Sequence, residues 1–344
     1  MNLRELKIPD RLNSGDTVAF ISISGGRGGD ADLLQRYNTG KARFEECFGV
    51  NVIETPNALK GSEYLYGHPE KRAEDLMWAL TNKDIKGIVC IMGGDDSYRV
   101  LPFIDTDVIR DNPKVFMGYS DIATWNAVFA YSGVRAFYGP NVLNPIAQPG
   151  SLDPYTEEAI RKALFSSDVI GEIKPCEKYT STNWTATSGE EITWTANDGY
   201  KVIQGTGTVK GRIISICGGP LQQIMGTRFF PCPEMWEDSI IAYEYGSPIN
   251  TYGSELAALH QLRAFAAAGI FEKAKAIITG PVADGEYKDT LLKVINNEAG
   301  RPDMVILENV DFIHRVPMTV LPTGALAEID CGKKTFTICE SGVK

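Results

Sequence analysis

The amino-acid sequence predicts an α/β protein, with a doubly wound, mostly parallel sheet in its first half and a smaller, β-rich α/β unit after it. Three observations support this class. Short apolar runs alternate with longer segments of helical periodicity over the first part of the chain. The runs are apolar throughout, as expected of strands covered on both faces. The chain has 344 residues, 43% hydrophobic and 23% charged, which suits about two globular domains.

The elements of the first part follow one another in a regular order. The predicted strands are 17–22, 51–54, 87–92, 114–117 and 135–138, and the predicted helices are 31–48, 68–80 and 121–131. Pro69 stands near the start of the second helix, where proline is favoured. Strands joined by helices in this way form a parallel sheet, and ligands bind at the carboxyl ends of such strands.

The regular alternation of strand and helix patterns ends at about residue 168. Segment 181–200 is polar, lacks periodicity and carries two tryptophans, so we predict a long loop or bridge with a function. A second unit follows, with a predicted helix over 253–268 and predicted strands over 209–216, 239–243, 275–279, 304–307 and 333–339. We therefore expect an N-terminal domain over 1–168, a linker and substrate loop over 169–205, and a C-terminal domain over 206–344.

Composition narrows the function classes. The net charge is −10 and no basic cluster occurs, which argues against nucleic acid as a partner. No apolar run approaches the roughly 20 residues of a membrane span, and the first residues contain no apolar leader. The seven cysteines include no CxxC pair, which favours reduced thiols in the cytoplasm. We expect a cytoplasmic protein that acts on small molecules or peptides.

Metal and nucleotide motifs are weak or absent. The three histidines are widely spaced and no HExxH occurs, so we expect no metal. The glycine-rich run after the first predicted strand places Ala31 at the third glycine of a dinucleotide fingerprint, and no GK[ST] follows any glycine loop. A flexible turn is the plainer interpretation of this run, and we expect no cofactor.

The stretch KVFMGYSDIATWNAVF has the order strand, tight turn, helix. A nucleophile elbow requires this order, and it would expose the hydroxyl of Ser120 at the end of the sheet. The amides of the following helix, including that of Asp121, could stabilise an oxyanion. Ile122 replaces the last glycine of the usual GxSxG pattern. The alternative interpretation makes Ser120 or Asp121 an ordinary helix N-cap.

A second turn, Gly93-Gly94-Asp95-Asp96, follows the third predicted strand. A glycine pair lets backbone amides approach a ligand closely. If Ser120 is a nucleophile, the amide of Gly94 or Asp95 is a candidate second oxyanion donor. The alternative interpretation is a plain turn.

A serine nucleophile needs a base and a carboxylate that orients the base. His68 precedes Pro69 at a helix start and His260 lies on a helical pattern, whereas His314 lies in VDFIHRVPMTVLP between two apolar runs. Elimination favours His314, and the alternative interpretation is a single loop histidine with no catalytic role. Glu244 directly follows the apolar strand 239–243, where a carboxylate is unusual, so it is the candidate to orient the base. The alternative interpretation is an acid in a surface turn.

Four stretches resemble one family in the order in which they occur. GGDDSYRVLPFID, MGYSDIATWNAVFAYSGVRAFYGP, the YEY segment and FIHRVPMTVLPTGA are similar to the LD-carboxypeptidase family of serine peptidases, which includes murein tetrapeptide carboxypeptidases and microcin C self-immunity peptidases. The resemblance implies a nucleophile domain carrying Ser120 and a smaller C-terminal domain supplying Glu244 and His314. It also implies an oxyanion hole made by the amides of Gly94 and Asp121, and a homodimer.

Two segments depart from the common pattern. Pro220 stands where many relatives carry a polar residue, which would alter the domain interface or the wall of the site. Segment 181–200 is long for a murein carboxypeptidase and resembles the microcin-immunity branch, in which a loop tryptophan stacks on a nucleobase. Trp184 is the first candidate for this contact and Trp194 the second, unless both only anchor the loop. Asp95 is a further candidate substrate contact.

The resemblance implies hydrolysis of an amide bond in a small peptide or an aminoacyl-nucleotide. One alternative is removal of the terminal D-amino acid from cytoplasmic murein tetrapeptide. A second is a non-catalytic nucleotide- or peptide-binding protein on the same scaffold.

Overall fold

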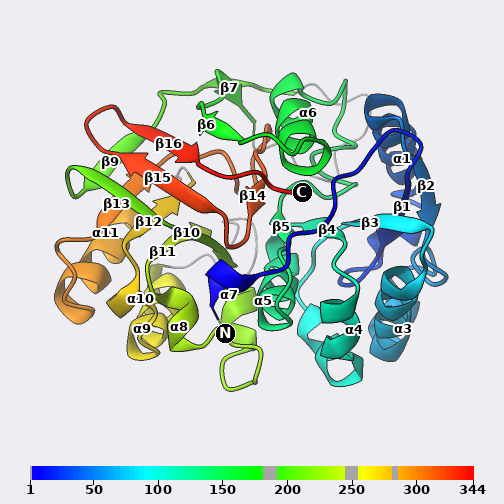
Figure 1. Ribbon diagram of the computed structural model, residues 1–344, viewed down its shortest axis with the longest axis horizontal. Coiled ribbons are helices and arrows are strands. Elements are labelled where there is room, and N and C mark those ends of the chain that lie inside the picture. The colour runs from blue at the N-terminus through cyan, green and yellow to red at the C-terminus, as the bar shows by residue number, and fades with distance from the viewer. Residues whose placement is uncertain (1, 181–191, 245–254, 281–285) are drawn as a thin grey trace.

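The computed structural model describes residues 2–180, 192–244, 255–280 and 286–344. Within these residues the strands form a six-stranded sheet, an eight-stranded sheet and a two-stranded ribbon. Figure 1 shows the six-stranded sheet on the right and the eight-stranded sheet on the left, with helices outside both. The predicted α/β class is confirmed.

The first sheet has the order β14-β5-β4-β3-β1-β2. Its parallel strands are β1 (Thr17–Ile21), β2 (Asn51–Glu54), β3 (Ile85–Cys90), β4 (Val115–Gly118) and β5 (Phe137–Tyr138). The strand order reverses beside β1, as in doubly wound folds. The helices connecting these strands are α1 (Leu34–Phe48), α2 (Ser62–Gly67), α3 (Pro69–Thr81), α4 (Thr106–Asp111) and α5 (Ala123–Tyr131).

Side chains of each strand alternate between two hydrophobic cores. Val18 and Phe20 of β1 pack into the core that holds Phe44 of α1. Ala19 and Ile21 pack into the other core, which includes Leu76 of α3 and Trp125 of α5. Successive side chains of a strand point to opposite faces, so a strand buried on both faces must be apolar throughout. This explains why the strand predictions from apolar runs lie close to the observed ones.

The second sheet has the order β6-β16-β15-β10-β11-β12-β13-β9. Its parallel centre consists of β10 (Thr208–Cys217), β11 (Ser239–Glu244), β12 (Ala276–Thr279) and β13 (Val305–Glu308). Antiparallel strands flank it: β6 (Gly171–Ile173), β9 (Lys201–Gln204), β15 (Leu326–Asp330) and β16 (Thr335–Ile338). The remaining helices are α6 (Pro154–Ile160), α7 (Gly218–Gln223), α8 (Pro233–Trp236), α9 (Glu255–Ala267), α10 (Ile270–Lys273) and α11 (Glu286–Lys293).

One strand crosses from the end of the chain into the first sheet. β14 (Leu321–Pro322) pairs antiparallel with β5, with Leu321 opposite Tyr138. One of the two hydrophobic cores contains Phe20 of the first sheet together with Ile240 of the second. The two sheets therefore share a core. The domain boundaries at 168 and 206 stay a prediction.

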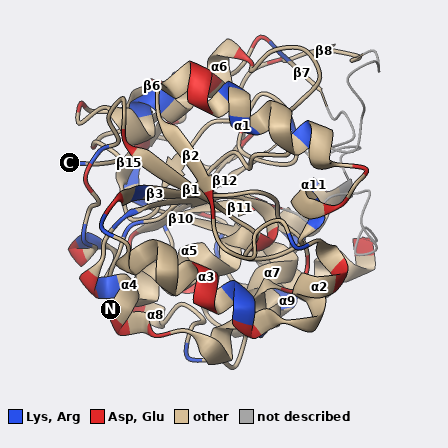
Figure 2. Ribbon diagram, turned by 90° about the vertical axis from the view of Figure 1, so that its right-hand side faces the viewer, with Lys and Arg blue, Asp and Glu red and all other residues tan. Residues whose placement is uncertain are grey.

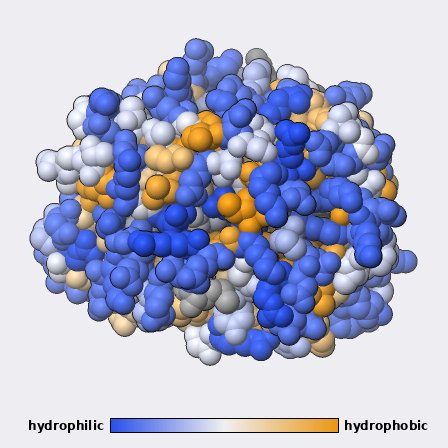
Figure 3. Space-filling model, viewed as in Figure 1, coloured by the Kyte–Doolittle hydropathy of each residue, from blue (hydrophilic) through white to orange (hydrophobic). Residues whose placement is uncertain are grey.

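Charged residues are distributed over the outer helices. Lys and Arg are intermixed with Asp and Glu in the view of Figure 2. The face in Figure 3 is mostly hydrophilic, with apolar residues in small separate areas. Across the described ranges, no helix has the length and apolar character needed to cross a membrane.

Candidate active site

Ser120 occupies a strained turn between β4 and α5. Its φ is +67°, in the left-handed region that residues other than glycine rarely adopt. Such strain costs about 1–3 kcal/mol and persists only where the surroundings impose it. Here Asn141 braces the turn, because its side chain accepts from the Tyr119 amide at 3.2 Å and donates to the Tyr119 carbonyl at 3.4 Å. This is the geometry of a nucleophile elbow.

The structure brings His314 and Glu244 to Ser120. The Nε2 atom of His314 lies 3.0 Å from the Oγ of Ser120. The Nδ1 of His314 hydrogen-bonds Oε1 of Glu244, which also accepts from the His314 amide at 2.9 Å. Glu244 ends β11 and its side chain is 1% exposed, so it depends on such partners. Three residues far apart in the chain therefore form one line of hydrogen bonds.

The carboxylate of Glu244 controls the charge of His314. Burial lowers the pKa of the imidazole, but the negative charge of Glu244 and the hydrogen bond to it outweigh burial, so the pKa of His314 is raised. The ring of Tyr119 lies edge-on to the imidazole with centroids 5.1 Å apart. His314 is thus held in one orientation by a charge on one side and an aromatic ring on another.

The glycine turn after β3 lies directly against Ser120. A Cβ on Gly93 would stand 2.8 Å from the Cβ and 3.1 Å from the Oγ of Ser120, and a Cβ on Gly94 would stand 2.4 Å from the Oγ of Ser24. Only glycine fits this turn. The amide of Asp121 lies in the first helical turn after Ser120, where amides lack an intrahelical acceptor. The amides of Gly94 and Asp121 thus come from the two segments that border the serine hydroxyl.

The side chain of Asp121 joins these two segments, a role that the sequence did not reveal. Its Oδ2 accepts from the Oγ of Ser24 at 2.5 Å and from the amide of Ser97 at 2.8 Å. Burial raises the pKa of this carboxyl group. An acid within an apolar helix start was the only available signal, because the partners lie 24 and 97 residues away.

The predicted substrate contacts lie in different places. Asp95 is exposed beside Gly94, and its carbonyl accepts from Gln223 at 2.8 Å. Trp194 is half-buried, with the Nζ of Lys178 4.9 Å from its ring centroid. Trp184 lies outside the described residues. His68 caps α3 and His260 is exposed on α9, so neither belongs to this group.

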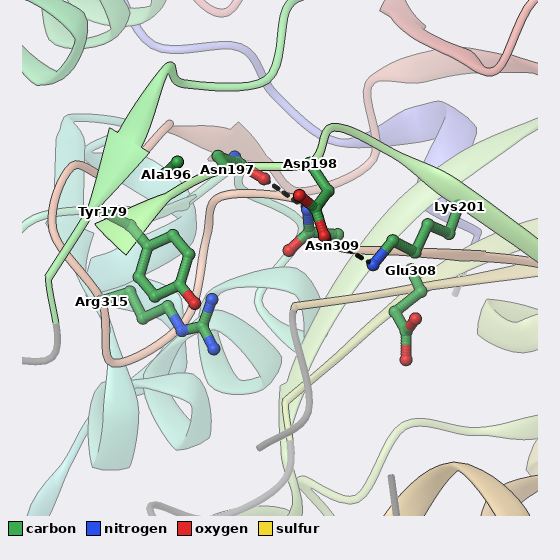
Figure 4. Close-up of a pocket in the computed structure, with 8 residues that line it drawn as sticks. All are labelled: Tyr179, Ala196, Asn197, Asp198, Lys201, Glu308, Asn309 and Arg315. Carbon is green, nitrogen blue, oxygen red and sulfur yellow. Dashed lines mark hydrogen bonds and ion pairs between the residues drawn. The ribbon is translucent and has the colours of Figure 1, made fainter. Parts of the chain in front are cut away.

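A polar pocket lies beside the His314 segment (Figure 4). Its volume is about 160 Å³, and it is lined by Tyr179, Ala196, Asn197, Asp198, Lys201, Glu308, Asn309 and Arg315. The guanidinium of Arg315 stacks 3.8 Å from the ring centroid of Tyr179. The ribbon strands β7 (Lys178–Tyr179) and β8 (Thr195–Ala196) supply part of this lining. Sequence reasoning did not identify this pocket.

Asp311 fastens the His314 segment to this ribbon. Its carboxylate accepts from the Cys176 amide at 2.9 Å, from the Cys176 Sγ at 3.2 Å and from the Asn197 side chain at 3.4 Å. Burial raises the pKa of Asp311 to about 6. Thr180 and Val316 also pair through their backbones. Both ends of the predicted substrate loop are therefore tied to the residues around His314.

No group of three or more His, Cys, Asp or Glu side chains with the spacing of a metal site occurs in the described ranges.

The chain is similar to known proteins in both sequence and fold. Residues 18–139 match the model of the LD-carboxypeptidase N-terminal domain, and residues 210–329 match that of the C-terminal domain. A Vibrio cholerae protein named as a carboxypeptidase is 28% identical, over 97% of this chain and 98% of its own length. The microcin C7 self-immunity protein MccF of Escherichia coli is also 28% identical, over 96% of this chain and 94% of its own.

A solved structure of MccF in complex with glutamyl sulfamoyl guanosine superimposes with a TM-score of 0.86 at 25% identity, covering 98% of this chain and 99% of that chain. Ser120 falls within the first matched region, and Glu244 and His314 fall within the second.

Proposed function

We propose, starting from the fact that the chain belongs to the LD-carboxypeptidase family of serine peptidases, that Ser120, His314 and Glu244 are its catalytic triad. The observation that supports this assignment is the unbroken line of hydrogen bonds from Ser120 Oγ through His314 to Glu244, with 3.0 Å between Oγ and Nε2. Serine hydrolysis requires this connection, because the hydroxyl is unreactive at neutral pH without an adjacent base.

The reaction is acyl transfer from an amide to water. The Oγ of Ser120 attacks the carbonyl carbon while Nε2 of His314 takes its proton. Glu244 keeps the other ring proton on Nδ1 and stabilises the imidazolium. The amides of Gly94 and Asp121 bind the developing oxyanion. The imidazolium then protonates the departing amine, and water hydrolyses the acyl-enzyme by the same steps.

The raised pKa of His314 suits both halves of this reaction. An imidazole that gains a proton more readily is a better base toward Ser120, and the Glu244 charge that raises its pKa also stabilises the imidazolium during attack. The cost is that more of the base is protonated at low pH. Activity should therefore fall as pH decreases through the pKa of His314.

The substrate that we propose is an aminoacyl-nucleotide or a similar small amide. Support comes from the likeness to MccF, whose solved complex contains glutamyl sulfamoyl guanosine. Trp184, Trp194 and Asp95 are the proposed contacts with the substrate. Murein tetrapeptide is the alternative substrate, favoured by the description of the two matching family models.

We further propose that the enzyme acts in the cytoplasm as a homodimer. No disulfide bond joins any of the cysteines that the structure describes, which suits a reducing compartment. The dimer is an expectation from the family, and light scattering on the purified protein measures it directly.

Hydrolysis assays test the proposed chemistry. Purified protein is incubated with glutamyl sulfamoyl adenosine or with murein tetrapeptide, and a fluorophosphonate probe reports the reactive serine. We expect cleavage of the first substrate and labelling of the protein. Ser120→Ala should abolish labelling and lower kcat by roughly 10⁶-fold. Ser151→Ala, at an exposed serine, is the control and should change neither.

The outcomes separate chemistry from substrate. Cleavage of murein tetrapeptide alone would refute the aminoacyl-nucleotide proposal and leave the triad standing. Full activity in Ser120→Ala would refute the triad.

A further inference from the structure

The hydroxyl of Tyr138 lies between the nucleophile and the acid of the proposed triad. Tyr138 ends β5 and is fully buried. Its hydroxyl hydrogen-bonds the Oε2 of Glu244, and the amide of Ser120 donates to the same hydroxyl oxygen at 3.2 Å. The chemistry described above does not use this residue.

The direction of these hydrogen bonds follows from the groups themselves. An amide N–H can only donate, and an ionised carboxylate can only accept. The Tyr138 proton must therefore point to Glu244 while an oxygen lone pair faces Ser120. His314 occupies Oε1 of Glu244 through its amide and its Nδ1, so Tyr138 satisfies the other oxygen.

The result is a closed circuit of hydrogen bonds. It runs from the Ser120 amide to Tyr138, from Tyr138 to Glu244, from Glu244 to His314, and from His314 back to the Ser120 hydroxyl. We propose that Tyr138 is a positioning residue for the triad, whose hydroxyl holds the strained Ser120 backbone and fixes the orientation of the Glu244 carboxylate. This inference rests on the proposed function of the triad.

The same contact accounts for the choice of oxyanion donors. Because the Ser120 amide donates to Tyr138, the amides of Asp121 and Gly94 are left to bind the oxyanion. Burial, followed by the charge of Glu244, raises the pKa of Tyr138 well above its ordinary value. The phenol therefore stays protonated through the working pH range and acts only as a hydrogen-bond donor and acceptor.

Packing around the ring does not depend on the hydroxyl. The ring contacts Tyr119 and Phe312 edge-on, with centroids 6.4 Å and 6.2 Å away. Tyr138→Phe keeps these contacts and removes only the oxygen. It removes the hydrogen bond that Oε2 of Glu244 accepts in a buried place, so the carboxylate that orients His314 is held less firmly.

The pH profile distinguishes positioning from packing. In Tyr138→Phe, the carboxylate of Glu244 loses one hydrogen-bond donor, so its charge acts more fully on His314 and raises the pKa of that base. This change moves the acid limb of the kcat profile to higher pH.

The test compares matched tyrosines. Tyr37 of α1 is also buried. Its hydroxyl donates to the carboxylate of Glu54 at 2.7 Å. Hydrolysis of glutamyl sulfamoyl adenosine is measured from pH 5 to 9 for the parent, Tyr138→Phe and Tyr37→Phe. We expect Tyr138→Phe to lower kcat roughly 10- to 100-fold with unchanged KM and a shifted acid limb, as for a lost hydrogen bond to a charged group. Tyr37→Phe should behave as the parent.

A second variant covers the case in which Tyr138→Phe fails to fold. Incorporation of 3,5-difluorotyrosine at position 138 preserves the shape of the ring and strengthens hydrogen-bond donation to Glu244, so the acid limb should move to lower pH. An unchanged limb there, or the same kcat in Tyr138→Phe and Tyr37→Phe, would overturn the inference. If Ser120→Ala retains full activity, the proposed function has failed instead.

Discussion

Asp311 should make the protein less stable as pH rises through the weakly acidic range. The native pKa of this carboxyl group is raised to about 6, and its side chain is 4% exposed. An aspartate in an unfolded chain has a pKa of about 3.9. Between these values the native state binds more protons than the unfolded state, so the free energy of unfolding falls as pH increases.

The size of the effect follows from the difference in pKa. About two units at 1.36 kcal/mol each give roughly 3 kcal/mol. The stabilisation is fully present below about pH 4 and is lost above about pH 6. Other groups titrate in the same range, so the quantity to measure is the difference between the parent and Asp311→Asn, which carries no ionisable group at this position.

Urea unfolding of both proteins at pH 4, 5, 6 and 7 provides this difference. Stability of Asp311→Asn relative to the parent should rise by up to about 3 kcal/mol between pH 4 and pH 7. Asp10→Asn, at a side chain that is 87% exposed, is the control and should give a nearly constant difference. A constant or falling difference for Asp311→Asn would refute the argument that this buried carboxylate is ionised at a cost.

Three further variants test other parts of the structure. Glu244→Gln should lower kcat by roughly 10⁴-fold, and because the charge that raises the pKa of His314 is gone, the acid limb of kcat/KM against pH should move to lower pH. Gly94→Ala places a Cβ 2.4 Å from Ser24 Oγ and should lower kcat by about 10²–10³ by displacing the oxyanion turn, whereas Gly219→Ala meets open space and should be neutral in the same assay. Arg72→Met breaks a buried ion pair of 2.8 Å with Asp96 and should cost about 3–5 kcal/mol in urea unfolding, while Arg110→Met, at an exposed pair, should change stability little.

Periodicity predicts what local physics determines. Apolar runs predicted a strand over 114–117 and a following helix, and the structure has β4 at Val115–Gly118 and α5 at Ala123–Tyr131. The same reasoning did not find β15, because Glu328 and Asp330 interrupt its short apolar run. It also predicted a strand over 135–138, whereas the observed strand β5 starts two residues later, at Phe137.

Sequence patterns did not identify the residues that support the site. Tyr138 and Asp311 form contacts with partners 106 and 135 residues away, and nothing in their neighbourhood in the chain marks them. A tyrosine at the end of a buried strand is ordinary core, and an aspartate between apolar residues resembles a turn. Their roles depend on which distant oxygen or amide lies opposite, which tertiary packing alone determines.

The connections of the chain on both sides of His314 explain how side chains from the two sheets keep their relative positions. Upstream, Asp311 fastens the segment to Cys176 and Asn197. Downstream, β14 pairs with β5, where Leu321 stands opposite Tyr138. The strand that carries Tyr138 is thus bound to the segment that carries His314 by backbone pairing, independently of the side-chain circuit. A small movement of one sheet against the other would carry both residues along with β5, so the contacts of Glu244 at the end of β11 are the ones that sense the relative placement of the sheets.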